Sequence, residues 1–140
     1  MQKPITPIRN PVLPFPEVSK AEARARLGVP DDVWMLLYVG RMAPEKNVSV
    51  LLQAMPHIVR GCPNARLWLV GPGPALDDLK AQAEAMNLNE WVHFTGPVPR
   101  DEVSLYLLAA DLFVFPSVTE SQGLVLDEAQ AAGLPCIVAN

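Results

Sequence analysis

The sequence has little cysteine and histidine and no long apolar segment, and each shortage excludes a class of protein. Only two cysteines, Cys62 and Cys136, and two histidines, His57 and His93, occur in its 140 residues; the cysteines are far apart from each other, and so are the histidines. This spacing excludes a disulfide framework and a cysteine–histidine metal site, and it favours a reducing cytoplasm. No apolar run approaches the roughly 20 residues that cross a bilayer, and the N-terminus lacks the core of a signal peptide. We therefore expect a cytoplasmic protein with no transmembrane segment and no metal cofactor.

The sequence also lacks an excess of basic residues. Its formal net charge is -4 and its pI is about 5.1, so nucleic acid or an anionic membrane is not expected as a partner. Half of the residues are hydrophobic and 19% are charged, an ordinary balance for a globular protein, and the length fits one domain. An anionic ligand must therefore be held by a local site, against an unfavourable overall field.

Apolar runs and helical patterns alternate along the chain after a proline-rich start. Residues 1–18 show no periodicity and are interpreted as an interdomain linker or docking segment, followed by a domain from 19 to 140. Strands are expected at 34–39, 66–70, 91–94, 112–115 and 136–139, and helices at 20–27, 48–59, 75–86, 102–110 and 124–132. The alternation predicts an α/β fold, a Rossmann-like doubly wound parallel sheet of about five strands with helices on both faces. The chain stops directly after the last strand, which indicates a piece of a longer protein.

A doubly wound sheet binds its ligand outside the carboxyl ends of the strands, where the strand order reverses. For the common order 3-2-1-4-5 this point lies between the first and the fourth strand. The loops that would meet there are 40–47 and 116–123, and they carry the most unusual residues of the chain. Gly71-Pro72-Gly73, by contrast, lacks the rest of a dinucleotide fingerprint and is interpreted as a plain strand-to-helix turn. His93, within a strand, is interpreted as structural.

The first of these loops reads GRMAPEKN. Gly40 lets the backbone turn at the end of the strand, while Arg41 and Lys46 bring a planar guanidinium and a compact ammonium to the rim of the sheet. Together these cations suit a diphosphate. The alternative is a solvated loop in which Glu45 pairs with a cation. The loop is not a P-loop, because the glycine pattern and the adjacent serine or threonine are missing.

The second loop and the helix after it read PSVTESQGLVLDEAQAAG. Gly123 at the helix start allows a ligand to approach free backbone amides, which together with the helix dipole attract anions. Glu120 lies just before this helix, and Glu128 falls at about 140° on the helical wheel, inside the apolar stripe, where an unpaired charge is costly. These carboxylates could accept hydrogen bonds from sugar or ribose hydroxyls. The alternatives are a carboxylate stabilised by the helix dipole at position 120 and a side chain that reaches solvent at position 128.

Four segments together resemble a known family. In chain order they are GRMAPEKNVSVLLQA, LWLVGPGP, VHFTGPVPRDEV and AADLFVFPSVTESQGLVLDEAQAAGLP. This combination is similar to the family 4 (group 1) retaining glycosyltransferases. The resemblance implies the C-terminal, nucleotide-sugar-binding domain of a GT-B enzyme, in which two Rossmann-like domains face each other. It implies transfer of a sugar, of the hexosyltransferase type, from a nucleotide diphosphate sugar to an acceptor hydroxyl with retention of configuration.

The resemblance implies a role for each loop of the site. Arg41, Lys46 and Glu120 would be catalytic, the two cations holding the donor diphosphate and the glutamate accepting hydrogen bonds from the donor sugar. Glu128 would bind the ribose hydroxyls, and the backbone around Val98 would contact the base. Backbone amides after the fourth strand would bracket the sugar and the phosphate, namely those of Ser121, Gln122, Gly123 and Leu124.

The resemblance also implies what lies outside the chain. The N-terminal domain, which binds the acceptor sugar or lipid, and the end of the C-terminal domain would be missing, so the chain alone would bind donor weakly and turn over little. No metal would be required, and the parent enzyme could be peripheral at a membrane. Two other functions stay open. One is a different GT-B enzyme, such as a nucleotide-sugar epimerase or a phosphorylase, and the other is a noncatalytic docking module, which would not require both cations and both glutamates.

Overall fold

The structure is a computed structural model that describes residues 18–116 and 123–138. Its elements are α1 (Lys20–Leu27), β1 (Trp34–Val39), the 3-10 helix η1 (Pro44–Lys46), α2 (Val48–Gly61), β2 (Ala65–Val70), α3 (Leu76–Ala85), β3 (Val92–Gly96), α4 (Arg100–Ala109), β4 (Leu112–Phe115), α5 (Gly123–Ala131) and β5 (Cys136–Val138). The predicted linker lies outside the described residues apart from Val18. No helix in the described ranges is long and apolar enough to cross a membrane.

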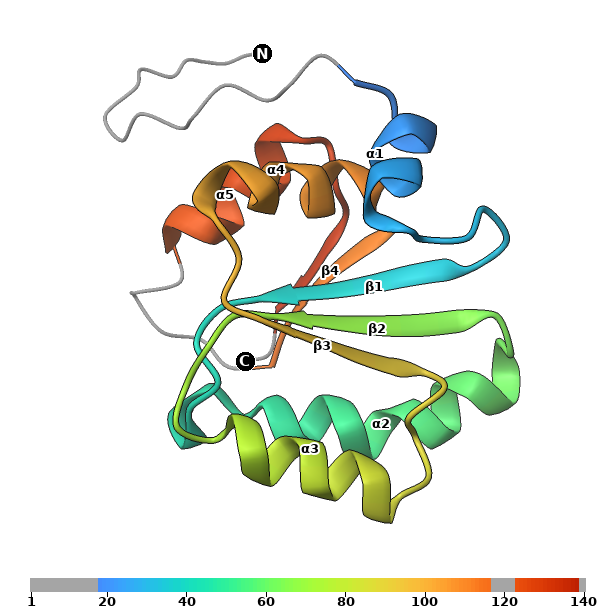
Figure 1. Cartoon of the computed structure of the whole chain (residues 1–140), viewed down its shortest axis with the longest axis vertical. Coiled ribbons are helices and arrows are strands. Elements are labelled where there is room, and N and C mark those ends of the chain that lie inside the picture. The colour runs from blue at the N-terminus through green and yellow to red at the C-terminus, as the bar shows by residue number, and fades with distance from the viewer. Residues whose placement is uncertain (1–17, 117–122, 139–140) are drawn as a thin grey trace.

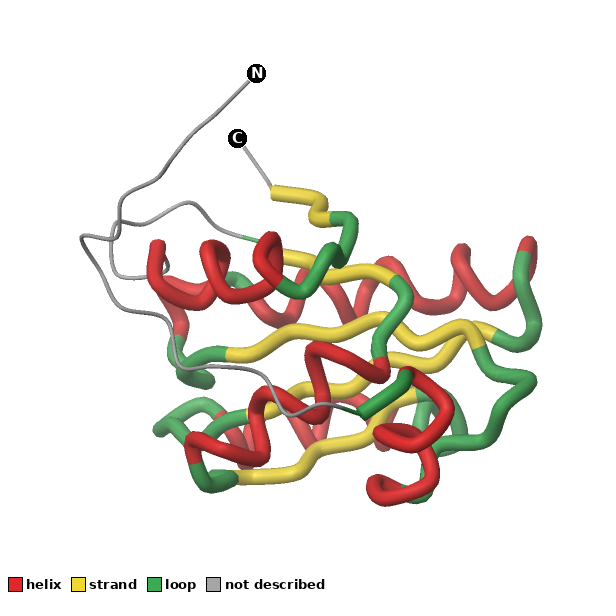
Figure 2. The backbone as a smooth tube through the Cα atoms, turned by 90° about the horizontal axis from the view of Figure 1, so that it is seen from above, coloured by secondary structure: helices red, strands yellow, loops and turns green. Residues whose placement is uncertain are grey.

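The strands form one parallel sheet in the order β3-β2-β1-β4-β5. Helices α2 and α3 cover one face, and α1, α4 and α5 lie on the other (Figure 1). Seen from above in Figure 2, the strands run side by side between these helices. The predicted α/β, Rossmann-like doubly wound fold is confirmed, and so is the strand order on which the predicted position of the site depends.

The core is built around the two central strands that the sequence shows as continuous apolar runs. Met35–Val39 of β1 and Leu67–Val70 of β2 are all buried, as expected for parallel strands covered on both faces. On one face, α2 packs Val48, Leu52 and Met55 against them, at the spacing of a helical stripe. Because both faces of the sheet are covered, a ligand can reach the sheet only at the ends of its strands and at the loops that follow them.

Helix α1 begins and ends where its capping residues predict. The hydroxyl oxygen of Ser19 accepts a hydrogen bond from the backbone N–H of Glu22 at 3.0 Å, and Gly28 adopts the left-handed conformation that terminates the helix. Elsewhere the predicted bounds shift slightly. Helix α4 begins at Arg100, two residues before the predicted start, directly after the extended Pro99. Strand β3 runs to Gly96, two residues beyond its predicted end.

Although α1 is rich in charged residues, one of them is buried in a contact at the amino end of the sheet. Arg24 is 4% exposed, and its guanidinium pairs with Asp111 at 2.7 Å. Asp111 also accepts a hydrogen bond from the backbone N–H of Met35 at 2.8 Å. The same guanidinium donates to four backbone carbonyls, those of Pro30, Asp31, Val33 and Ala109. This cluster fastens α1 to the starts of β1 and β4, and the sequence pattern did not predict it.

Candidate functional site

The loops predicted to carry the site leave neighbouring strands at the same edge of the sheet. Strands β1 and β4 are parallel partners, paired through Leu36–Leu112 and Leu37–Phe113, so their carboxyl ends lie together. After β1 the chain continues along the sheet through α2 to β2, and after β4 it continues through α5 to β5 in the opposite direction. This reversal is the predicted switch point. The loop 40–47 is described in full, whereas 117–122 lies outside the described residues.

A buried tyrosine at the end of β1 fixes the loop 40–47 through a hydrogen bond. Tyr38 is fully buried, its hydroxyl donates a hydrogen bond to the carbonyl of Arg41 at 3.0 Å, and its ring makes an edge contact with Phe115 at the end of β4. A Cβ on Gly40 would lie 2.7 Å from this hydroxyl, so glycine is required there for space. Burial, with a contribution from the Glu45 carboxylate, raises the pKa of Tyr38, which keeps the hydroxyl a donor throughout the neutral range.

The Gly-Pro-Gly turn after β2 supports the same loop from the side. Met42 donates its backbone N–H to the carbonyl of Pro72 at 2.8 Å and accepts the N–H of Ala75 at the same distance. A Cβ on Gly71 would lie 2.0 Å from the carbonyl oxygen of Gly40, and one on Gly73 would lie 2.2 Å from that of Met42. The prediction of a plain strand-to-helix turn is therefore incomplete, because two backbones meet here at a distance that only glycine permits.

The two predicted cations differ in their surroundings. Arg41 is exposed at the rim, directly after Gly40, while Lys46 is 8% exposed at the end of η1. Asn47 then adopts a left-handed conformation that turns the chain from η1 into α2. Both predicted cations thus lie on the loop after β1, Arg41 exposed and Lys46 buried. The loop is held in place by its own short helix, the Tyr38 hydroxyl and the Gly-Pro-Gly turn.

Glu128 lies on the buried side of α5, as its place in the apolar stripe predicts. It is 5% exposed, and its Oε2 accepts a hydrogen bond from the Nη2 of Arg100, with which it forms an ion pair. Its Oε1 is buried and has no hydrogen-bond partner among the described residues. Burial raises the pKa of Glu128, and the nearby charge of Arg100 opposes part of this rise. The alternative of a side chain reaching solvent is wrong.

The other predicted site residues lie at the same carboxyl edge of the sheet or outside the described residues. Val98 is half-buried between β3 and α4, and Gly123 and Leu124 open α5. Glu120, Ser121 and Gln122 lie outside the described residues. Sequence reasoning missed two contributors to the site, Tyr38 and Arg100. The first was hidden in an apolar run, and the second gave no signal because its partner is 28 residues away.

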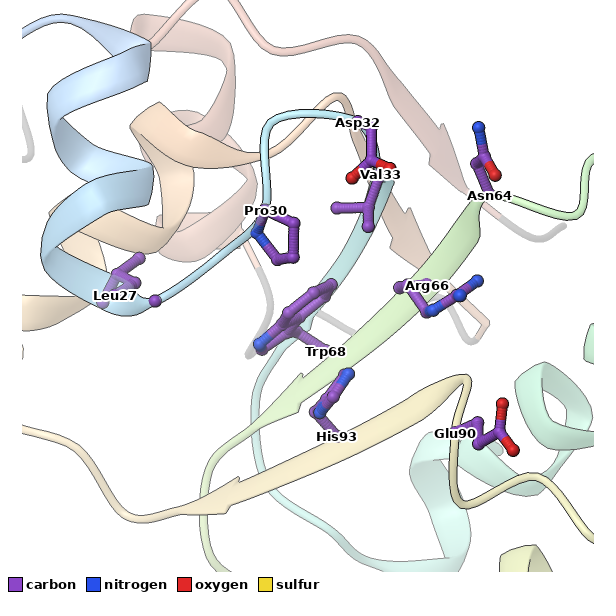
Figure 3. Close-up of a pocket in the computed structure, with 10 residues that line it drawn as sticks. Leu27, Pro30, Asp32, Val33, Asn64, Arg66, Trp68, Glu90 and His93 are labelled. Atoms are coloured by element: carbon purple, nitrogen blue, oxygen red, sulfur yellow. The ribbon is translucent and has the colours of Figure 1, made fainter.

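A hollow of about 450 Å³ opens elsewhere, at the amino ends of β1, β2 and β3 (Figure 3). The rings of Trp68 and His93 stack there with centroids 4.4 Å apart, which agrees with a structural role for this histidine. Burial and the nearby Arg66 lower the pKa of His93. None of the predicted site residues lines this hollow. Within the described part of the chain, no cluster of three histidine, cysteine or acidic side chains could hold a metal ion.

The family model for glycosyl transferases group 1 matches residues 19–140. The chain belongs to the group 1 glycosyltransferases. This glycosyltransferase chain is 38% identical to the alpha-monoglucosyldiacylglycerol synthase of Streptococcus pneumoniae over 116 residues, which cover 83% of the chain and 26% of that relative. It is 37% identical to the D-inositol 3-phosphate glycosyltransferase of Streptomyces bingchenggensis over 134 residues, covering 89% of the chain and 30% of that relative.

A solved structure has a similar fold. The crystal structure of HepE from Anabaena in complex with UDP and glucose has a TM-score of 0.73 and 25% sequence identity. The match covers 86% of the glycosyltransferase chain and 33% of HepE. The glycosyltransferase chain thus spans only about a quarter to a third of the length of the relatives it matches.

Proposed function

We propose that this chain is the donor-binding domain of an enzyme that transfers a sugar from a nucleotide diphosphate sugar to an acceptor hydroxyl, with retention of configuration. One observation carries the proposal. The loop that bears Arg41 and Lys46 and the helix that begins at Gly123 follow adjacent strands at the same edge of the sheet. The family and the HepE complex with UDP and glucose support a nucleotide sugar as the ligand of this edge.

The proposed chemistry is electrostatic. Cleavage of the bond between sugar and diphosphate leaves negative charge on the departing diphosphate. The guanidinium of Arg41 and the ammonium of Lys46 would stabilise this charge together with the backbone amides at the start of α5. Because these groups neutralise the diphosphate, the proposed reaction needs no metal ion. Glu120 would accept hydrogen bonds from the donor sugar, and the amides of Ser121 and Gln122 would bracket it.

The remaining parts of the donor would lie on the neighbouring elements of the same edge. The base would contact the backbone around Val98, which follows β3, and the ribose hydroxyls would bind Glu128 on α5. The acceptor, a sugar or a lipid, would be bound mainly by a second domain outside this chain. We place the reaction in the cytoplasm, which the two unpaired cysteines support.

Isothermal titration of the 140-residue chain with UDP, GDP and ADP tests the proposal. We expect at least one of them to bind in the millimolar range or better. Arg41→Ala should weaken that binding by roughly tenfold or more, since it removes a charge-assisted contact to phosphate. It should also flatten the dependence of affinity on salt, because the attraction of an exposed cation is screened by ions.

Arg26→Ala is the matched control, because Arg26 is also an exposed arginine but lies on α1, paired with Glu22. It changes the net charge equally and should leave nucleotide affinity within about twofold, the range expected from a screened surface charge. The proposal fails if none of the three diphosphates binds the wild-type chain at millimolar concentration. It also fails if the two arginine variants lose affinity to the same extent.

A further inference from the structure

One oxygen of Glu128 is paired and the other is not, and this division is unusual for a buried carboxylate. The side chain is 7% exposed. Its Oε2 accepts from Arg100, whereas Oε1 is buried without a hydrogen-bond partner among the described residues. Native proteins pair nearly all of their buried polar atoms, so an unpaired one calls for an explanation. A donor that arrives with a ligand is such an explanation.

Arg100 is well placed to set the direction of this carboxylate. It is the first residue of α4, directly after the loop that carries Val98, so it lies at the carboxyl edge of the sheet together with the other site residues. Its side chain is 45% exposed while that of its partner is 7% exposed. The pair is therefore asymmetric: the arginine reaches in from the surface and the glutamate is fixed within the packed stripe of α5.

We propose that Arg100 is a positioning residue, which binds Oε2 of Glu128 and thereby presents Oε1 to the ribose diol of the donor nucleotide. This inference rests on the proposed function, because it assumes that a nucleoside diphosphate binds at this edge. The planar guanidinium holds one oxygen in a defined direction, which leaves the other oxygen aimed at a single place. Arg100 does not need to touch the nucleotide itself.

The charge of Arg100 adds a second effect. Burial raises the pKa of Glu128, and the guanidinium counteracts this by favouring the ionised form. An ionised carboxylate only accepts hydrogen bonds, so both ribose hydroxyls can donate to it. Without the arginine, the carboxyl group would both lose its orientation and bind a proton more readily.

The test measures discrimination between two probes. The first is whichever of UDP, GDP and ADP binds the wild-type chain most tightly, and the second is its 2′,3′-dideoxy analogue. We expect the wild type to prefer the ribose form by roughly tenfold or more, the value of a hydrogen bond to a charged group. Arg100→Met should reduce this ratio to nearly one, and Arg100→Lys, which keeps the charge but not the planar fork, should give an intermediate ratio. Arg26→Met is the matched control and should keep the full ratio.

A double variant shows how Arg100 acts. If it acts through Glu128, then Arg100→Met combined with Glu128→Gln has the same ratio as Glu128→Gln alone. Circular dichroism shows which variants are folded. If Arg100→Met is not folded, the ratio measured for Arg100→Lys tests the inference instead. An unchanged ratio in Arg100→Met, or additive losses in the double variant, overturns the inference while leaving the proposed function intact. Absence of any nucleotide binding by the wild type overturns the proposed function and the inference with it.

Discussion

Glu128 is a carboxylate at a position where packing favours an apolar side chain. Its neighbour on α5, Ala129, is fully buried, and the carboxylate itself is almost fully buried too. Its partner Arg100 is half-exposed and well solvated, so the ion pair recovers only part of the cost of burying the carboxylate. A residue that lowers stability while keeping a carboxylate oxygen unpaired is typical of a binding site rather than of a core.

Glu128→Gln should therefore stabilise the folded chain at neutral pH, by on the order of 1 kcal/mol, because it removes a buried charge but keeps an oxygen that can accept from Arg100. The pKa of Glu128 is raised in the folded state, so the wild type has its full stability below the ordinary glutamate pKa of 4.5 and loses stability as the pH rises through the folded value. The variant does not titrate there. Urea unfolding at several pH values should give nearly equal free energies of unfolding for the two chains in acid and a higher value for the variant at pH 7.

Glu22→Gln supplies the comparison at the same scale. Glu22 is half-exposed and pairs with Arg26 on the surface of α1, so its replacement should cost at most a few tenths of a kcal/mol. The stability of this variant should not increase relative to the wild type as the pH rises. If Glu128→Gln were less stable than the wild type at pH 7, the ion pair of Glu128 with Arg100 would stabilise the fold, and the burial of Glu128 would no longer indicate a binding role.

At the scale of elements, the site loop depends on the turn next to it as well as on its own sequence. Gly73→Ala would place a Cβ 2.2 Å from the carbonyl oxygen of Met42, so the loop 40–47 must shift. We expect a loss of stability of roughly 1–3 kcal/mol from this crowding, and a loss of nucleotide affinity, because Arg41 is carried on the displaced backbone. Thermal unfolding and titration with UDP, GDP and ADP measure the two effects.

Gly61→Ala is the appropriate comparison for that variant. Gly61 ends α2, and a Cβ there would have no atom within 4 Å. This alanine should be neutral or slightly stabilising, because alanine is the better helix former. Equal behaviour of the two alanine variants in the nucleotide titration would contradict the view that the Gly-Pro-Gly turn positions the site loop.

Elements whose signals are local in the chain could be predicted from the sequence. Strands β1 and β4 and helix α1 have the predicted bounds, since their patterns and caps are local in the chain. Helix α2 continues through Pro56 even though proline removes a helical hydrogen bond, because its apolar stripe packs against the sheet. The strand order and the position of the switch point followed from the alternation of elements and from the rules of parallel sheets.

The sequence could not predict contacts that depend on how side chains and elements are placed in space. The Tyr38 hydroxyl binding the carbonyl of Arg41 requires knowing which face of β1 meets the loop. The pairing of Arg100 with Glu128 requires the relative position of α4 and α5. The Gly-Pro-Gly sequence predicts a turn, but no local pattern encodes the close approach of two backbones there.

At the scale of the whole molecule, the carboxyl edge of the sheet carries the residues proposed to bind the ligand, and the amino edge carries a cluster that stabilises the fold. The carboxyl edge carries Arg41, Lys46 and the start of α5, in a chain whose overall charge of -4 opposes an anionic ligand. The binding of a diphosphate must therefore come from this local arrangement. The amino edge carries the cluster of Arg24 and Asp111, which joins α1, β1 and β4. We infer that stability and binding can be changed separately.

Asp111→Asn tests this separation. Burial alone would raise the pKa of Asp111, but hydrogen bonds from Lys20 and from the N–H of Met35, with the charges of Lys20 and Arg24, lower it overall. The ionised aspartate thus stabilises the fold above the ordinary aspartate pKa, and this contribution is lost as the pH falls through the lowered folded value. At pH 7 the variant should lose roughly 1.5–3 kcal/mol of stability, the value of a hydrogen bond to a charged group.

The affinity of the Asp111→Asn chain for the best-binding nucleoside diphosphate should equal that of the wild type, because the lost contacts lie at the amino edge. Asp77→Asn, an exposed aspartate in the first turn of α3, makes the same change in net charge and should alter stability by at most about 1 kcal/mol, the effect of a charge on a helix dipole. The stability gap between Asp111→Asn and the wild type should close as the pH falls, since the wild-type carboxylate is then protonated. A parallel loss of nucleotide affinity in Asp111→Asn, measured well below its unfolding temperature, would mean that the two edges are coupled through the sheet and that the site is not local.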